Sequence, residues 1–159
     1  MRRQYFIVLI VLAATAILVE ARLLAHHAFA SEFDQNAPIA LQGTLTKMEW
    51  VNPHAWLHLE VKDPKTGKIT SWAIEAGGPN NLLRRGFTKN MIPIGDEIYV
   101  EGYRAKDPTA LRANGHILET VKDGKAFFLG SSGTGAPYEG QQGVEYDING
   151  RPILQKNKK

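Results

Sequence analysis

The side chains best suited to chemistry are histidines, and one of them, His54, lies in a seven-residue motif. Trp50-Val51-Asn52-Pro53-His54-Ala55-Trp56 combines two indoles, an Asn-Pro pair and one imidazole. Proline fixes its own φ and pushes the residue before it out of the helical region, so this pair predicts a sharp turn. We therefore expect His54 to be presented by a short corner at the end of a sheet.

A second group of histidines lies near the amino terminus, where His26 and His27 are adjacent. If export cleavage leaves His26 first, its free amine and its ring can bind one metal ion together. His54 would then complete a three-nitrogen, T-shaped set suited to Cu(II). Cleavage one residue earlier would make His27 the third residue, and amine, two backbone nitrogens and ring would form a square-planar copper site. No cofactor is required, but copper is the predicted metal, with His26, His27 and His54 as ligands.

Two other interpretations of these histidines stay open. His54 could serve structure, by satisfying carbonyl groups of its loop, or it could contact a ligand without any metal. Adjacent histidines cannot both point the same way in a strand, so His26 and His27 would not act as equivalent ligands. His58 and His116 are further candidates, but nothing in their spacing requires a metal.

A groove for a small ligand or a protein partner is the leading hypothesis for function. Aromatic and arginine side chains suit anionic or sugar-like ligands, and also protein interfaces. The candidate ligand-binding residues are Trp50, Asn52, His54, Trp56, Arg84, Arg85, Tyr103 and Arg104, with Trp72 as a further aromatic. The alternative is that the tryptophans pack the core while the arginines line a solvated helix.

Catalysis has weaker support, and we predict no catalytic residues. Carboxylates are present at Glu32, Asp34, Glu49, Glu60 and Glu75, yet no pair has a spacing that implies acid and base roles. No serine stands in a nucleophile elbow, and no glycine-rich loop has the lysine of a phosphate cradle. An enzyme is therefore the last of the alternatives, after a binding module and a copper protein.

The amino terminus predicts export. Arg2 and Arg3 precede an apolar run of roughly 15 residues, which matches a secretory signal, whereas a membrane-spanning helix usually needs about 20. Residues 1–25 are the predicted signal peptide, with an uncleaved anchor through Leu24 as an alternative. Cleavage after Ala28-Phe29-Ala30 would instead remove both histidines. The expected location is the periplasm, with membrane contact only if the segment is retained.

Charge and cysteine usage exclude several classes of protein. The formal net charge of the chain is +3, but Arg2, Arg3, Arg22 and Glu20 lie in the predicted signal, so the remainder is close to neutral. A nearly neutral exported domain is a poor candidate for nucleic-acid binding. The chain has no cysteine, which excludes disulfides, thiolate metal sites and cysteine nucleophiles.

Hydrophobic alternation predicts an all-β domain with one short helix. The expected strands are 39–50, 56–61, 69–74, 97–103 and 116–121, with a further run at 125–129, a helix at 81–85 and a polar loop at 105–115. Three strands, a helix and two strands is the order of a small five-stranded OB-like Greek-key barrel, and an antiparallel β-sandwich is the alternative. Residues 26–38 form an arm whose Phe29 and Phe33 fill a hydrophobic groove, 39–130 the OB-like barrel domain, and 131–159 a flexible tail.

These motifs together resemble a family of small exported bacterial proteins of unknown function. The resemblance rests on His26-His27-Ala28-Phe29-Ala30-Ser31-Glu32-Phe33-Asp34 and on the Trp50–Trp56 motif. Further matches are Gly78-Pro79-Asn80, Leu83-Arg84-Arg85-Gly86 and Gly102-Tyr103-Arg104-Ala105-Lys106, so the likeness spans about residues 25–130. Ala28 departs from the pattern, which usually has serine there. The resemblance implies export and a shared fold, favours cleavage just before His26, and implies no activity.

Overall fold

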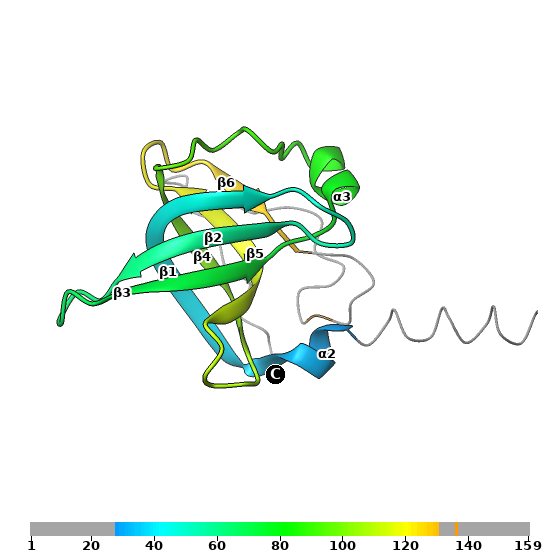
Figure 1. Ribbon diagram of the computed structural model, residues 1–159. Coiled ribbons are helices and arrows are strands. Elements are labelled where there is room, and N and C mark those ends of the chain that lie inside the picture. The colour runs from blue at the N-terminus through cyan, green and yellow to red at the C-terminus, as the bar shows by residue number, and fades with distance from the viewer. Residues whose placement is uncertain (1–27, 131–135, 137–159) are drawn as a thin grey trace, which may run out of the picture.

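The computed structural model describes residues 28–130 and Ala136, and this part of the chain is mostly β-sheet (Figure 1). A helix, α2, precedes the first strand, and a second helix, α3, lies between the third and fourth strands. In chain order the elements are α2 (Ala28–Glu32), β1 (Phe33–Glu49), β2 (Trp56–Lys62), β3 (Ile69–Glu75), α3 (Pro79–Arg84), β4 (Glu97–Ala105), β5 (Arg112–Thr120) and β6 (Ala126–Phe128).

One long strand, β1, organises the sheet because it pairs with a different neighbour along each half. Its first half is antiparallel to β4, from Pro38 opposite Tyr103 to Thr44 opposite Glu97. Its second half is antiparallel to β2, ending with Glu49 opposite Trp56. Bending one strand between two neighbours requires close backbone approach, and a Cβ added at Gly43 would lie 2.5 Å from the Glu60 carbonyl oxygen.

The sheet closes on itself through a short parallel pairing between β3 and β5. The opposed residues are Ala73 and Arg112, Ile74 and Ala113, and Glu75 and Asn114. Strands β1, β2, β3, β5 and β4 therefore form a ring, and β6 pairs with the second half of β5, beyond the residues that pair with β3. The all-β prediction is confirmed, and the strands belong to one sheet, not to the two sheets of the alternative sandwich.

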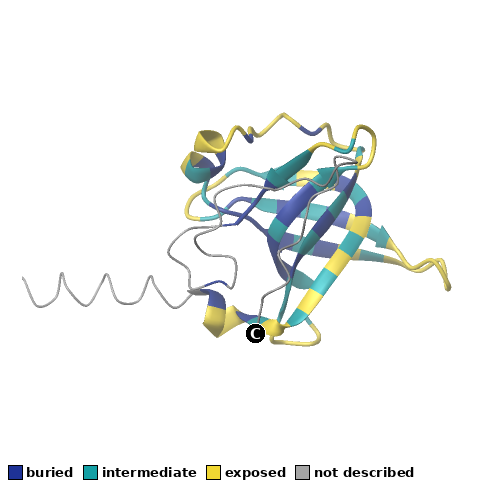
Figure 2. Ribbon diagram, turned by 180° about the vertical axis from the view of Figure 1, so that it is seen from behind, coloured by how far each residue is buried: buried dark blue, intermediate teal, exposed yellow. Residues whose placement is uncertain are grey.

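Alternate side chains of the strands fill the inside of the ring, as the period of two predicts. Leu57 and Leu59 of β2, Ile74 of β3, Ile98 of β4 and Leu118 of β5 are each fully buried. Figure 2 shows this alternation as dark bands across the strands, while the tip of the hairpin between β2 and β3 is exposed. A second, smaller cluster forms from Phe29, Phe33, Phe128 and Ala136.

Helix α3 follows the predicted break after β3. It begins with Pro79 at its first turn, a position where the missing N–H of proline costs nothing, and Gly78 is its N-cap. The chain leaves the helix through Gly86, whose φ of 81° is the left-handed conformation that glycine adopts most easily. The helix spans 79–84 instead of the predicted 81–85, and its buried Leu82 packs into the main core.

Most element boundaries differ from those expected by one or two residues, and the largest differences are at the amino-terminal arm, β1 and β5. The arm predicted to be extended forms helix α2, and β1 already begins at Phe33, because Phe29 and Phe33 are both buried in the second cluster. Strand β5 begins at Arg112, inside the predicted polar loop, because its first residues pair with β3 and close the ring.

Two predicted segments fall largely outside the described residues. The predicted signal peptide and the histidine pair lie in residues 1–27, and the predicted tail is described only at Ala136, which is buried. Within the described part, no helix is both long enough and apolar enough to cross a membrane.

Candidate functional site

The predicted corner lies between the end of β1 and the start of β2, and backbone contacts hold it against the segment after β3. The Ala55 N–H donates to the Gly77 carbonyl at 3.2 Å, and the Ala76 N–H donates to the Ala55 carbonyl at 2.8 Å. The Asn52–Pro53 peptide bond is cis. A Cβ added at Gly78 would lie 2.6 Å from the Pro53 carbonyl oxygen, so the approach requires glycine there.

The imidazole of His54 is bound by a buried carboxylate. Its Nδ1 lies 2.8 Å from Oε1 of Glu75, the last residue of β3, and the Glu75 side chain is 7% exposed. The His54 side chain is 24% exposed, so the ring lies between the buried carboxylate and the solvent. Since Nδ1 is committed to Glu75, Nε2 is the ring nitrogen available to a ligand.

Asn114 of β5 completes this buried group from a third strand. Its side-chain amide nitrogen donates to the same Oε1 of Glu75 at 3.5 Å, and its side chain is buried. The parallel register places Asn114 opposite Glu75, so the contact follows from ring closure. Sequence reasoning named Glu75 as an isolated carboxylate and missed Asn114, which lies in the polar stretch predicted to be a loop.

The surroundings of His54 favour its charged form. The hydrogen bond to Glu75 raises the pKa of His54, the charges of Glu75 and then Glu32 add to the increase, and burial opposes it. The ring is therefore held by a charge-assisted contact that is stronger than a neutral hydrogen bond. Glu32, the last residue of α2, therefore contributes to the electrostatics of the corner.

Contacts between α2 and the ring fix that helix in place. Glu32, its last residue, forms an ion pair with Arg112 of β5 at 3.0 Å. The Arg112 guanidinium carbon in turn lies 4.9 Å from the ring centroid of Trp56, the residue that follows the corner. Lys106 adds two bonds, with its backbone N–H donating to the Glu32 carbonyl and its Nζ donating to the Ala30 carbonyl.

Aromatic packing secures the other side of α2. The Phe29 ring centroid lies 5.7 Å from that of Phe33 and 5.7 Å from that of Tyr103, the latter pair edge to face. Both phenylalanines are almost fully buried, with exposed fractions of 3% and 2%. The arm therefore fills a hydrophobic surface as predicted, and the chain immediately after His26 and His27 is anchored beside the corner.

The remaining predicted ligand-binding residues do not gather into one groove. Trp50 packs against Phe87 of the core, with 6.2 Å between ring centroids, whereas Asn52 is exposed at the corner. Arg84 is exposed at the end of α3. Arg85 lies over Phe128 and donates to the Gly130 carbonyl, and Arg104 lies over Trp72 and donates to the Pro108 carbonyl. Of the predicted set, Trp56 is the residue that joins the surroundings of His54, through Arg112.

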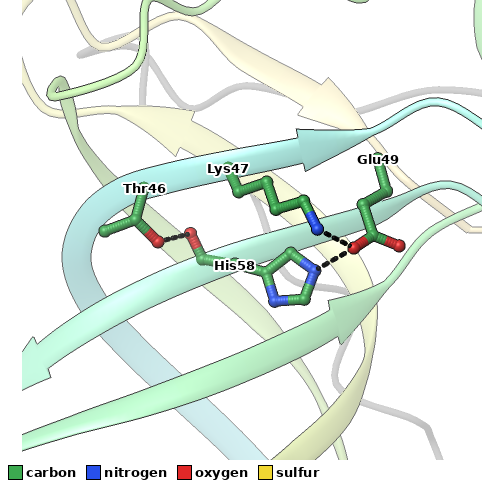
Figure 3. Close-up of polar contacts among 4 residues, drawn as sticks. All are labelled: Thr46, Lys47, Glu49 and His58. Carbon is green, nitrogen blue, oxygen red and sulfur yellow. Dashed lines mark hydrogen bonds and ion pairs between the residues drawn. The ribbon is translucent and has the colours of Figure 1, made fainter.

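His58, on β2, contacts a carboxylate that is more exposed than the partner of His54. Figure 3 shows its Nε2 directed at Glu49, at 3.2 Å from an oxygen that Lys47 also contacts. Glu49 is 34% exposed, unlike the buried Glu75, so water screens this group. His116 packs edge to face against Phe128. The carboxylate beside His58 is therefore unlike the buried one that orients His54.

An imidazole whose Nδ1 donates to a carboxylate can do two kinds of chemistry. It can transfer a proton through Nε2, or it can bind a metal there while the carboxylate fixes the ring. Within residues 28–130 and Ala136, no three histidine or acidic side chains are arranged to hold a metal ion. His26 and His27, the other predicted ligands, lie outside the described residues.

Comparison with known proteins gives a family but no function. No curated protein and no solved structure matches the chain. One family model does match, over residues 14–114, which is more than half of the sequence and includes the corner, Glu75 and Asn114. The chain therefore belongs to a family of unknown function, DUF6152.

Proposed function

We propose that this chain is an exported binding module whose ligand is a copper ion, held at His54. The observation that supports the proposal is the contact between His54 Nδ1 and the buried Glu75 at 2.8 Å. Histidines that bind metals usually donate their second ring nitrogen to a carboxylate, a carbonyl or water, which fixes the tautomer and makes the ring a stronger ligand. A second hydrogen bond, donated by the Asn114 amide nitrogen to the same Glu75 oxygen, restrains the carboxylate as well.

The other donors would come from the chain start. Helix α2 is anchored by Phe29, by Lys106 and by the ion pair between Glu32 and Arg112, and His27 immediately precedes this helix in the sequence. Removal of a signal ending at Ala25 would leave His26 with a free amine, so one residue would offer two nitrogens. With no cysteine in the chain, such a site uses nitrogen and oxygen donors, and Cu(II) is the divalent ion that they bind most tightly.

The broader hypothesis of a ligand groove has less support from the geometry. Arg85, Arg104 and Arg112 each lie over an aromatic ring, and each also makes a hydrogen bond or an ion pair within the fold. The candidate residues also fall at different places around the ring. We therefore favour copper as the ligand over a molecule bound in a groove. The proposed role as a binding module in the periplasm is unchanged.

Intact mass spectrometry of the mature protein should precede any metal measurement. We expect periplasmic protein with His26 as its first residue. A first residue at Ser31 would remove both histidines and contradict the proposal directly. An intact leader would remove the free amine and contradict the proposed ligand set.

The decisive experiment is titration of the protein with native His26 terminus by Cu(II) alone, with calorimetry and electron paramagnetic resonance. We expect one ion per chain and hyperfine splitting from nitrogen ligands. His54→Gln should weaken binding by at least about tenfold, the lower end of losses seen at metal sites, and acetylation of the His26 amine should do the same. His58→Gln is the matched control and should bind normally.

Two results would overturn the proposal. Absence of stoichiometric binding would remove the metal altogether. Equal affinity in the wild type and in His54→Gln would show that the arm binds copper by itself, without His54. In either case the Glu75 contact would be structural.

A further inference from the structure

We infer that a second site, independent of the His54 cluster, binds a single-chain amphiphilic anion such as a fatty acid. A pocket of about 330 Å³ lies between the second half of β1 and the loop before β4. This volume is at the lower end of the roughly 300–1,000 Å³ found for small-molecule sites. Its lining residues are Thr46, Lys47, Met48, Lys89, Asn90, Ile92, Pro93 and Ile94.

The pocket arises where β1 leaves its neighbour β4. The last pairing with β4 is Thr44 opposite Glu97, and the loop is then tied to Leu45 by the Gly95 N–H at 2.8 Å and by the Asp96 carbonyl at 2.9 Å. The register of β1 against β2 shifts between Leu45 and Lys47, which is a β-bulge or a similar irregularity. Bulges turn side chains away from their regular positions, and the pocket lies at this shift, with Thr46 and Lys47 in its lining.

The lining is apolar at its base and cationic at its rim. Ile92 is 3% exposed and belongs to the main core, and Met48 packs against that core. Ile94 and the neighbouring Met91 are 58% and 39% exposed, so the apolar surface continues out to solvent. Lys47 and Lys89 are both exposed, and no carboxylate lines the pocket. Apolar surface beside two ammonium groups complements an acyl chain with an anionic head group.

The two lysines are not equivalent. The Lys47 ammonium contacts the Glu49 carboxylate, which also lies near His58 (Figure 3). An anion at Lys47 therefore competes with Glu49, whereas Lys89 makes no ion pair among the described residues. Lys89 should contribute more to the binding of an anionic head group.

The test is a titration of ¹⁵N-labelled protein with decanoate, followed by backbone amide shifts. We expect saturable shifts confined to residues 46–48, 89–92 and 94. Decyltrimethylammonium has the same chain with the opposite charge and should bind at least about tenfold more weakly, because the lysines repel it. Equal binding of the two amphiphiles would overturn the anionic preference, and shifts elsewhere would overturn the site.

Matched variants separate the pocket from general surface effects. Lys89→Gln should weaken decanoate binding by about twofold to fivefold, the range for an exposed charge contact, and Lys47→Gln by less. Ile94→Asp should abolish binding, while Ile69→Asp, at the same exposed fraction of 58%, should leave it unchanged. Lys122→Gln, on an exposed turn, is the lysine control. Equal losses in the controls, or binding to anionic lipid vesicles without binding to decanoate, would reject the inference.

Discussion

At the scale of single residues, the contact between His54 and Glu75 couples charge to stability. The folded protein raises the pKa of His54 above its ordinary value of about 6.5, first through the hydrogen bond to Glu75. A raised pKa means that the folded state holds the proton more tightly than the unfolded chain. The contribution of this contact is therefore complete below pH of about 6.5 and disappears as the pH rises through the folded pKa.

We predict that the urea midpoint of the metal-free protein falls as the pH is raised from about 6 through the folded pKa of His54. Glu75→Gln should flatten this dependence, because the amide lacks the charge that holds the proton. Proton NMR of the His54 ring should show a lower pKa in that variant. His58→Gln is the control and should keep the wild-type slope, and a Glu75→Gln protein with an unchanged slope would contradict the assignment.

A double-mutant cycle should measure the coupling between the two side chains. His54→Ala leaves the carboxylate of Glu75, 7% exposed, without its cationic partner and should cost about 1–3 kcal/mol in the free energy of unfolding. Adding Glu75→Gln removes the buried charge, so the double variant should be more stable than the sum of the single losses by about 1 kcal/mol. Additive losses in urea denaturation would show that the contact contributes little.

Sequence reasoning found His54 but not its partner, and the reason is geometric. The corner is specified locally, since Asn52 and Pro53 define a turn whatever the rest of the chain does. Glu75 reaches His54 because β2 and β3 pair with Trp56 opposite Glu75, and Asn114 reaches Glu75 through the parallel pairing of β3 with β5. Register between distant strands is not visible in alternation, so neither contact could be predicted.

At the scale of elements, strands with clear alternation were predicted well and irregular ones were not. β2 begins at Trp56 as expected, and its inward Leu57 and Leu59 are fully buried. The start of β5 was missed because Arg112-Ala113-Asn114-Gly115 has no apolar period, and it is a strand because its backbone pairs with β3 and β4. Helix α2 has five residues, too few for a helical period to be recognised.

The position of α2 should depend on Phe29 more than on its ion pair. Phe29→Ala removes a ring that is 3% exposed, and hydrogen exchange should accelerate at the Lys106 amide, which donates to Glu32. Arg112→Gln removes an exposed ion pair and should have a smaller effect. Amides inside the ring, such as that of Leu118, should stay protected in both variants. Equal protection of Lys106 in wild type and Phe29→Ala would contradict the role given to the aromatic cluster.

At the scale of the whole molecule, ring closure ties the site to global stability. The pairing of β3 with β5 is short, and it both joins the two halves of the sheet and sets Asn114 beside Glu75. The site therefore requires a closed ring as its scaffold. An all-β domain was predictable from alternation, whereas the closure depends on three parallel pairs that no local pattern marks.

Because the five strands of the ring share one main core, we expect the described domain to unfold in a single transition. Tryptophan fluorescence reports Trp72 in the core and Trp56 on the flank, and its midpoint should coincide with that of far-ultraviolet circular dichroism. Ala113→Ser places a hydroxyl at the β3–β5 closure, where Ala113 is 1% exposed, and should lower the free energy of unfolding by about 1–3 kcal/mol. Both midpoints should move together. Ala40→Ser, exposed on β1, is the control and should change stability by less than about 0.5 kcal/mol. Separate midpoints in Ala113→Ser would mean that the β3–β5 closure opens independently of the core, and a site resting on Asn114 and Glu75 could then be lost without unfolding the sheet.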